Sequence, residues 1–533
     1  MRISTSQYFE TSATGYSKNF SDTAKTQAQI SSGNRIQSAG DDPVGAAKLL
    51  QLQQQSTLLT QYSGNMTSVT NSLTQEESVL DSITTALQRA QELTIQAGNG
   101  GLSDADRTSI ASEIGEIEKN VLGLLNTKDS NGQYMFSGSK TSTPPYVQNS
   151  DGSYTYQGDQ TQLSLQVSDT LQLATNDTGY GILETAVNTS RTQTSMTAPV
   201  DANGAVVDDG RVTVSDGRLE SLTTYNKAFT DGQPYKLTFT SSTQFTLTNG
   251  KGQDVTAQVT GNGTFDPKAD GGTTISLYGV EFDIDVAAKE SDLGTVADAD
   301  IAGRTFRLTS KPDSLSSTRN AANTSTAQLT SASVTNADNY AAGFPAGGAV
   351  IKFTSNSEYE VYAQPLTDSS RAIGKGTVEA AAIGSTITAA GVTFKLSGEA
   401  GEGDSFSVNA NSHKTQNVLD TLHQLKTALE KPVTDAKSAQ ALKNATDSAL
   451  GNLASANENI DISRGQIGAR LNSLAIQNDE NVSLALANKS TQSAIADTDF
   501  ATASVTLSLQ QTMLQASQLA FAKISQLSLF NKL

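Results

Sequence analysis

The chain has 533 residues, 36% of them hydrophobic, a mean hydropathy of −0.34 and a formal net charge of −18. It contains no cysteine, which excludes disulfides, thiolate nucleophiles and thiolate-bound metals. The acidic balance argues against nucleic acid or an anionic membrane as a partner, because phosphate groups are bound by basic surfaces. The simplest interpretation of the charge is a solvated acidic surface.

No targeting segment is expected. The first residues, MRIST, have no apolar core of signal-peptide length, and no stretch approaches the roughly 18 apolar residues of a membrane helix. We therefore expect a cytoplasmic protein, or one that is exported without a cleaved signal peptide.

Proline divides the chain into three parts. Only Pro43 and Pro432 of the ten prolines lie outside residues 144–365. Because proline breaks helices, its scarcity near both ends permits long helices there. We expect an α+β, multidomain fold in which N- and C-terminal helices form a discontinuous bundle or coiled coil around a β-rich insertion. The expected parts are terminal helices at 1–45 and 496–533, a helical rod with a small β element at 46–185 and 411–495, and a β-rich head at 186–410.

The N-terminal rod shows a heptad pattern. An apolar residue recurs at every seventh position from residue 52 to residue 87: Leu52, Leu59, Met66, Leu73, Leu80 and Leu87. This spacing predicts a coiled-coil or bundle helix that ends at the glycines of residues 98–101. Ser103 with Asp106 then predicts the cap of a second helix, antiparallel to the first.

On the C-terminal side, an apolar stripe runs from Leu450 to Leu474 with 3–4 spacing. Asn457, Arg464 and Asn478 occupy core-type positions on that stripe. They either fix the register between helices or face solvent at a frayed interface, and the pattern leaves both interpretations open.

The extreme ends carry thinner apolar faces. Ordering one residue costs about 1–2 kcal/mol of backbone entropy, which so thin a face does not offset. We therefore predict that both ends are disordered in the monomer and become helical when neighbouring subunits cover them. The residues predicted to form this assembly interface are Phe9, Tyr16, Phe20, Arg35, Ile36, Leu509, Met513, Ala520, Ile524 and Leu527.

The middle of the chain contains an internal repeat. The stretch LTFTSSTQFTL at 237–247 aligns with IKFTSNSEYEV at 351–361, and TISLYGVEFDI at 274–284 aligns with TITAAGVTFKL at 386–396. Alternating apolar and polar residues around tight turns predict antiparallel strands. We expect two tandem β modules near 230–295 and 345–410, and a shorter β element near residues 154–167.

Nothing in the sequence predicts catalysis. The two histidines, His413 and His423, are ten residues apart, a spacing that matches no zinc motif. Asp41 and Asp42 precede Pro43, which favours helix-starting acids over a catalytic pair. We expect no enzyme activity, no catalytic residue, no cofactor and no metal.

Several segments together resemble the bacterial flagellin superfamily. Residues 32–43, SGNRIQSAGDDP, resemble its SG-x-RI-x-x-A-x-DD segment. Residues 131–138, NGQYMFSG, resemble its NG-x-Y-x-FSG turn, and residues 464–472, RGQIGARLN, resemble its C-terminal R-x-x-IGAR-x-N helix. The start, MRIST, and the end, ISQLSLF at 524–530, are similar to the junction subunits of that superfamily, whereas the Leu-Leu-Arg type of tail found in filament flagellins is absent.

The resemblance covers roughly residues 1–185 and 411–533. It implies an extracellular structural subunit that forms the junction between the flagellar hook and the filament and is needed for motility. It further implies export through the flagellar type III apparatus with a chaperone, and polymerisation with itself, with hook-associated protein 1 and with flagellin. Filament flagellin is the alternative, and a secreted adhesin on a flagellin-like frame is the third interpretation.

Overall fold

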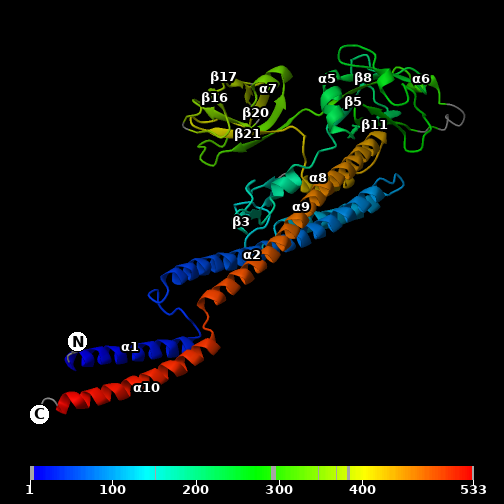
Figure 1. Cartoon of the computed structure of the whole chain (residues 1–533). Helices are drawn as coiled ribbons and strands as arrows, with labels where there is room; N and C mark the ends of the chain where they lie inside the picture. Colours follow the sequence, from blue (N-terminus) through cyan, green and yellow to red (C-terminus); the bar gives the residue numbers. More distant parts are fainter. Residues whose placement is uncertain are drawn as a thin grey trace. The chain divides into compact units, whose positions relative to one another are not determined.

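The computed structural model describes residues 5–149, 152–287, 289, 296–345, 347–367, 369–380 and 385–530. Long helices form both ends of the chain and strands fill the middle, which confirms the expected α+β class (Figure 1). The chain divides into two compact units. The first comprises Met1–Thr74, Leu163–Thr175 and Gln466–Leu533, and the second comprises Gln75–Gln162 and Asn176–Gly465.

The first unit is almost entirely helical. It contains α1 (Thr5–Ser32), α10 (Phe500–Phe530), the beginning of α2 (Pro43–Ala97), the end of α9 (Ala436–Ala496), and a two-stranded sheet of β3 (Ser164–Gln166) and β4 (Gln172–Ala174). Asp42 caps α2, because its Oδ1 accepts the Gly45 N–H at 2.9 Å and Pro43 occupies the first helical position. The interpretation of Asp42 as a helix-starting acid is therefore confirmed.

Buried amides join α2 to α9 within the first unit. Asn481 Nδ2 donates to Leu59 O at 2.9 Å, and Asn488 Nδ2 donates to Leu52 O at 3.0 Å. The two asparagines are seven residues apart and only 5% exposed. On α9, buried polar residues therefore continue the apolar stripe of residues 450–474. Asn478, in contrast, is exposed.

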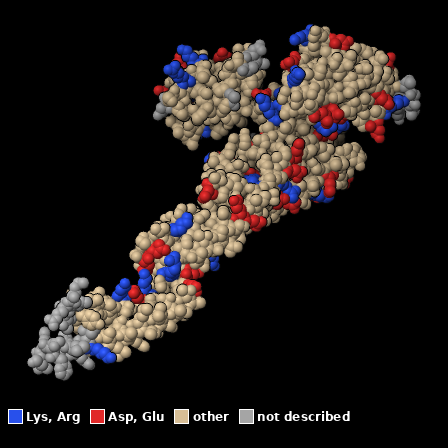
Figure 2. Space-filling model, viewed as in Figure 1, with Lys and Arg blue, Asp and Glu red and all other residues tan. Residues whose placement is uncertain are grey.

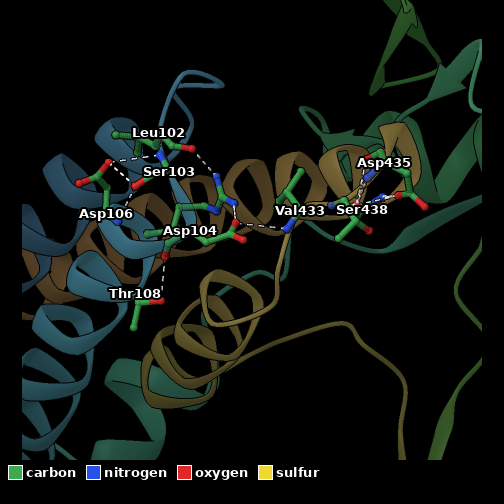
Figure 3. Close-up of polar contacts among 10 residues, drawn as sticks. Leu102, Ser103, Asp104, Asp106, Thr108, Val433, Asp435 and Ser438 are labelled. Carbon is green, nitrogen blue, oxygen red and sulfur yellow. Dashed lines mark hydrogen bonds and ion pairs between the residues drawn. The ribbon is translucent and has the colours of Figure 1, made fainter.

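The helices of the second unit form as the patterns predict. They are the remainder of α2, α3 (Asp104–Leu125), α8 (Val418–Leu429) and the beginning of α9. Ser103 and Asp106 cap α3 reciprocally, which confirms the predicted start of this helix (Figure 3). Asp104 also accepts the backbone N–H of Val433, in the turn between α8 and α9, at 3.4 Å (Figure 3).

The two remaining core-type polar residues lie in the second unit. Arg464 pairs with Glu77 and with Asp81, both at 2.9 Å, so this position holds α9 against α2 by charge. Asn457 is half-buried, and its Oδ1 has no hydrogen-bond partner.

The β-rich part enters and leaves the helices at one place, because Val187 and Thr415 form an antiparallel bridge. A two-stranded sheet of β1 (Tyr146–Gln148) and β2 (Tyr154–Tyr156) precedes this point. Where one short β element was expected, the structure thus contains two separate hairpins, β1–β2 and β3–β4.

The strands after residue 190 form two groups with separate hydrophobic cores. The strands of the first group are β5 (Thr192–Ala198), β6 (Val212–Val214), β7 (Arg218–Leu219), β8 (Tyr235–Phe239), β9 (Phe245–Thr248), β10 (Thr273–Leu277), β11 (Val280–Val286) and β12 (Thr305–Ser310). Those of the second group are β13 (Ser314–Arg319), β14 (Leu329–Val334), β15 (Ala349–Phe353), β16 (Glu358–Ala363), β17 (Gly374–Thr377), β18 (Glu379–Ala380), β19 (Ser385–Ala389), β20 (Val392–Leu396) and β21 (Ser405–Asn411). Short helices connect the strands: η1 (Tyr180–Glu184), α4 (Leu222–Thr224), η2 (Tyr225–Phe229), α5 (Thr230–Gly232), η3 (Thr256–Gln258), α6 (Asp298–Ile301) and α7 (Ala337–Gly343).

The two groups have the same strand order. One sheet of the first group runs β5-β12-β8-β9, and its counterpart runs β13-β21-β15-β16 with β17 added at the edge. The other sheet runs β10-β11-β6 in the first group and β19-β20-β14 in the second, with β18 added beyond β19. The hairpins turn at Tyr278-Gly279 and Ala390-Gly391, where all four residues have a positive φ between 46° and 81°.

Candidate assembly surface

Helices α1 and α10 lie side by side in the first unit (Figure 1). Their contact is aromatic: the ring centroid of Phe521 lies 5.2 Å from that of Phe9 and 6.1 Å from that of Tyr16. Asn19 Nδ2 adds a hydrogen bond to Ser517 Oγ at 2.6 Å. Phe9 and Tyr16 therefore face α10 rather than open solvent.

Helix α10 is apolar on two faces. One face, which carries Leu507, Leu514 and Phe521, is partly buried. The other is bare: Leu509 is 55% exposed and Met513 is 49% exposed. A helix that is hydrophobic all round is normally covered on every side. The uncovered face of α10 is therefore the natural candidate for contact with another chain.

This bare face is extended along α10 by Val505, Leu519 and Ala520, which are exposed. Phe20 is also 57% exposed, but it lies on α1, four residues after Tyr16 and therefore on the side of α1 that faces α10. Helix α10 carries no charged residue before Lys523, and the face of α1 and α10 visible in Figure 2 shows few charged side chains. We call the set Val505, Leu509, Met513, Leu519 and Ala520 the bare face.

Arg35 and Ile36 have a different place, in the segment between α1 and α2. The Arg35 guanidinium donates to Ile495 O through Nη2 at 2.8 Å and Nε at 3.2 Å, and its backbone N–H donates to Ala496 O at 2.6 Å. These carbonyls end α9 and have no partner within the helix, so Arg35 acts as its C-terminal cap. Ile36 is half-buried and lies beside Gly45, where an added Cβ would come within 2.7 Å of Ile36 Cδ1.

The same segment is fixed by local charge. The carboxylate of Asp41 forms an ion pair with the Lys25 ammonium at 2.8 Å and accepts a hydrogen bond from the backbone N–H of Ser38 at 2.9 Å. Both contacts hold the pKa of Asp41 well below its usual range. In the segment between α9 and α10, Thr498 N–H donates to Gly33 O at 2.8 Å, and Asp499 caps α10 by accepting the N–H of Ala501 at 3.0 Å. The two connections to the terminal helices are thereby paired with each other.

The structure therefore separates the predicted interface residues. Phe9 and Tyr16 belong to the α1–α10 contact, and Arg35 and Ile36 belong to the paired connections. Leu509, Met513 and Ala520 belong to the bare face, and Phe20 is exposed on α1. The side chains of Ile524 and Leu527 lie outside the described residues. Whether any of these residues contacts another chain stays a prediction. Phe521 was missed, although the seven-residue spacing of Leu507, Leu514 and Phe521 would have identified it.

Among the residues that the structure describes, no group of three or more His, Asp or Glu side chains is arranged to hold a metal ion. His423 Nδ1 lies 3.2 Å from Glu118 Oε1, and His413 is half-buried at the end of the second β group. No helix within the described part of the chain is long and apolar enough to cross a membrane.

Comparison with known proteins finds similarity to bacterial flagellar proteins. Residues 3–141 match the family model of the bacterial flagellin N-terminal helical region. It is also similar to flagellar hook-associated protein 3 of Salmonella typhimurium, with 36% identity over 182 residues, which is 34% of this chain and 56% of the relative. The protein of the same name from Escherichia coli K12 is 33% identical over 209 residues, 38% of this chain and 65% of the relative. Both matches span less than two thirds of the relatives' own length.

Flagellins are similar over shorter stretches. Flagellin of Listeria monocytogenes is 30% identical over 152 residues, 28% of this chain and 47% of the relative. The crystal structure of flagellar hook-associated protein 3 from Legionella pneumophila covers 83% of this chain and 98% of its own, with 21% identity and a TM-score of 0.46.

Proposed function

We propose that this chain is a structural subunit of the bacterial flagellum and forms the junction between the hook and the filament. The observation that carries the proposal is its identity of 36% and 33% with two proteins named flagellar hook-associated protein 3. The N-terminal region of the flagellin type supports the wider class.

The bare face supplies a physical basis for polymerisation. Fully burying one Leu or Met side chain contributes about 1.5–3 kcal/mol, and Leu509 and Met513 are both half-exposed in the single chain. A second copy that covered them would recover this free energy without new charge pairs. In this proposal the terminal helices, 1–45 and 496–533, are disordered in the monomer and ordered by neighbours.

The remaining assignments follow from this role. The subunit is exported through the flagellar type III apparatus without a cleaved signal, and it contacts hook-associated protein 1, flagellin and an export chaperone. It acts outside the cell, binds no cofactor and is no enzyme. Residues 46–185 and 411–495 form the helical rod, and residues 186–410 form the head.

We further propose that the head is a duplicated β module. Three observations support this: the shared strand order of the two groups, the positive φ at Gly279 and Gly391, and the matching contacts of these two turns. The Gly279 carbonyl accepts the N–H of Ser221 at 3.1 Å, and the Gly391 carbonyl accepts the N–H of Asn336 at 3.0 Å. Each module therefore packs its hairpin turn against the start of a short helix.

Filament flagellin is the second candidate, because flagellins also match the chain, with 30% identity over 152 residues in the case of Listeria monocytogenes. Electron microscopy of a deletion strain separates the two. A junction subunit predicts hooks without filaments and flagellin released into the medium. Loss of filaments without released flagellin, when flagellin synthesis is intact, would contradict the junction role.

A complementation test addresses the bare face. Removing residues 505–533 should leave a folded chain that is secreted but not incorporated. The matched control removes residues 314–411, whose ends can be rejoined because Ser314 and Asn411 are paired neighbours in the β13–β21 ladder. Restored motility with the first deletion, or lost secretion with the second, would overturn this division of roles.

A further inference from the structure

An asparagine followed by a glycine can react with its own backbone. The glycine nitrogen attacks the amide carbon of the asparagine side chain, and the absence of a Cβ on glycine lets it come close. The reaction needs a glycine N–H without a hydrogen bond and room for the peptide to turn, so the fold decides which pairs can react. The chain contains five such pairs: Asn99-Gly100, Asn131-Gly132, Asn203-Gly204, Asn249-Gly250 and Asn262-Gly263.

Two of the pairs are closed by similar turns, each with an aspartate two residues before the asparagine. Gly132 N–H donates to Asp129 O and Gly204 N–H donates to Asp201 O, both at 3.0 Å. In each turn the aspartate carboxylate also accepts the N–H of the asparagine at 2.8 Å. The attacking nitrogen is therefore engaged in both turns, although both glycines have open space around them.

Two further pairs lie in the first β group and are closed by its packing. Gly250 N–H donates to Gly232 O at 2.8 Å. Gly263 is buried, and its carbonyl accepts the N–H of Phe245 at 2.8 Å. A Cβ added at Gly263 would come within 2.5 Å of Phe245 O. Turning either peptide would break these contacts.

The pair Asn99-Gly100, in the turn between α2 and α3, is open. Within the part of the chain that the structure describes, the Gly100 N–H donates no hydrogen bond, and a Cβ added at Gly100 would meet nothing within 4 Å. Both residues are exposed. Asn99 Oδ1 accepts the N–H of Gly101 at 3.1 Å, a hydrogen bond that spans Gly100 and holds the amide along the peptide that attacks it. The same N–H is placed to stabilise negative charge that develops on Oδ1.

We propose that Asn99 is a site of spontaneous covalent modification, at which the Gly100 nitrogen converts the side-chain amide into a succinimide that water then opens. The Gly100 nitrogen gives up its proton and bonds to Cγ of Asn99, the Cγ–Nδ2 bond breaks, and the amide nitrogen leaves with a proton as ammonia. Water then adds to either carbonyl of the ring and yields aspartate or isoaspartate. One water is consumed for each ammonia released, and no oxidant or reductant is needed.

The product changes the entry to α3. The new carboxylate follows the C-terminus of α2, where unpaired carbonyl groups already carry partial negative charge. The isoaspartate product also lengthens the backbone by a methylene group. Asn99 O accepts the N–H of Leu102 at 3.2 Å, directly before the cap at Ser103, so the modification loosens this turn. The inference concerns one turn of the second unit and does not depend on the proposed flagellar role.

Peptide mapping by mass spectrometry, on the full folded chain incubated at mildly alkaline pH, tests the proposal. Conversion at Asn99 should be roughly tenfold or more faster than at each of the other four asparagines, because each of those must first break at least one hydrogen bond. The matched control is the same chain in guanidinium chloride. Unfolding removes the hydrogen bonds, so all five pairs should then react at similar rates.

Two variants separate ring closure from direct hydrolysis of the amide. Gly100→Ala places a Cβ in open space but crowds the attacking nitrogen, so most of the conversion at Asn99 should be lost. Gly123→Ala, in α3, also adds a Cβ with nothing within 4 Å and should leave the rate at Asn99 unchanged. The proposal is overturned if another pair reacts as fast as Asn99 in the folded chain, if folding slows Asn99 as much as the others, or if Gly100→Ala converts at the unaltered rate.

Discussion

Replacing Gly391 by alanine tests the architecture of the second β group. Gly391 lies in the turn between β19 and β20 with φ +79°, and its carbonyl accepts the N–H groups of Thr335 at 2.9 Å and Asn336 at 3.0 Å. A Cβ added there would meet the backbone of α7, coming within 2.5 Å of Tyr340 N. Backbone cannot swing aside as a side chain end can, so α7 or the turn must move.

The cost follows from these contacts. A left-handed conformation costs a residue with a Cβ about 1–2 kcal/mol relative to glycine. Moving α7 away also weakens two backbone hydrogen bonds, each of which contributes about 0.5–1.5 kcal/mol. We expect Gly391→Ala to lower the free energy of unfolding of this group by about 2–5 kcal/mol, a large part of the stability of a small domain.

Hydrogen exchange is the appropriate assay, because it resolves the two β groups within one chain. Protection should fall in peptides of β14, β19 and β20 and stay unchanged in β8 to β11. Gly398→Ala is the matched control: Gly398 lies in the same group, has no positive φ, and an added Cβ would meet nothing within 4 Å. Its effect should stay within about 0.5 kcal/mol.

Two results would refute this reasoning. Equal effects of Gly391→Ala and Gly398→Ala would show that the turn is not constrained by α7. An equal loss of protection in both β groups would show that they unfold as one body, against the proposal of a duplicated module.

Three further changes have defined outcomes. Leu509→Asp should alter the free energy of unfolding of the purified chain by less than about 0.5 kcal/mol, because the side chain is 55% exposed, yet it should abolish incorporation into flagella. Leu509→Met is the conservative control. An immunoblot of sheared flagella that shows Leu509→Asp incorporated would contradict the role of the bare face. Phe521→Ala removes the ring between two aromatic side chains of α1. Measured on the assembled polymer, in which the terminal helices are proposed to be ordered, hydrogen-exchange protection should fall in α1 and α10 but not in the β groups; unchanged protection in α1 would argue against the contact. Burial would raise the pKa of Asp404, but hydrogen bonds from Ser325 and from backbone N–H groups lower it to about 2. Asp404→Asn should therefore lower the free energy of unfolding by on the order of 1 kcal/mol at pH 7, and by less as the pH falls from 3.8 towards 2. A loss that does not depend on pH in urea titrations would refute this.

Local patterns predicted the helices well. The heptad from Leu52 to Leu87 is buried as its spacing required, and the caps at Asp42 and Ser103 begin helices at the expected positions. These features depend on residues within one or two turns of each other, so their geometry is set by short-range hydrogen bonds and by the 3.6-residue period. The alternation of the repeated segments predicted strands for the same reason.

The candidate assembly surface was predicted only in part. The stripe through Leu509 and Met513 was recognised as apolar, but the pattern did not reveal that α1 covers a different face of the same helix. That choice is made by Phe521 and its contact with Phe9, more than 500 residues apart in the chain. A helix with apolar residues on two faces has no single preferred side, and only the tertiary partner selects one.

Long-range polar contacts were beyond the reach of the sequence. Arg35 was predicted to lie at an assembly interface, and the structure shows that its guanidinium caps α9 at Ile495. Glu118 of α3 and Asp420 of α8, far apart in the chain, both accept hydrogen bonds from Tyr154 of β2. The sequence alone therefore determined where helices and strands form, because that depends on neighbouring residues. Which faces are covered and which carboxyl groups meet at one tyrosine was decided by tertiary packing, because those energies arise only when distant segments meet.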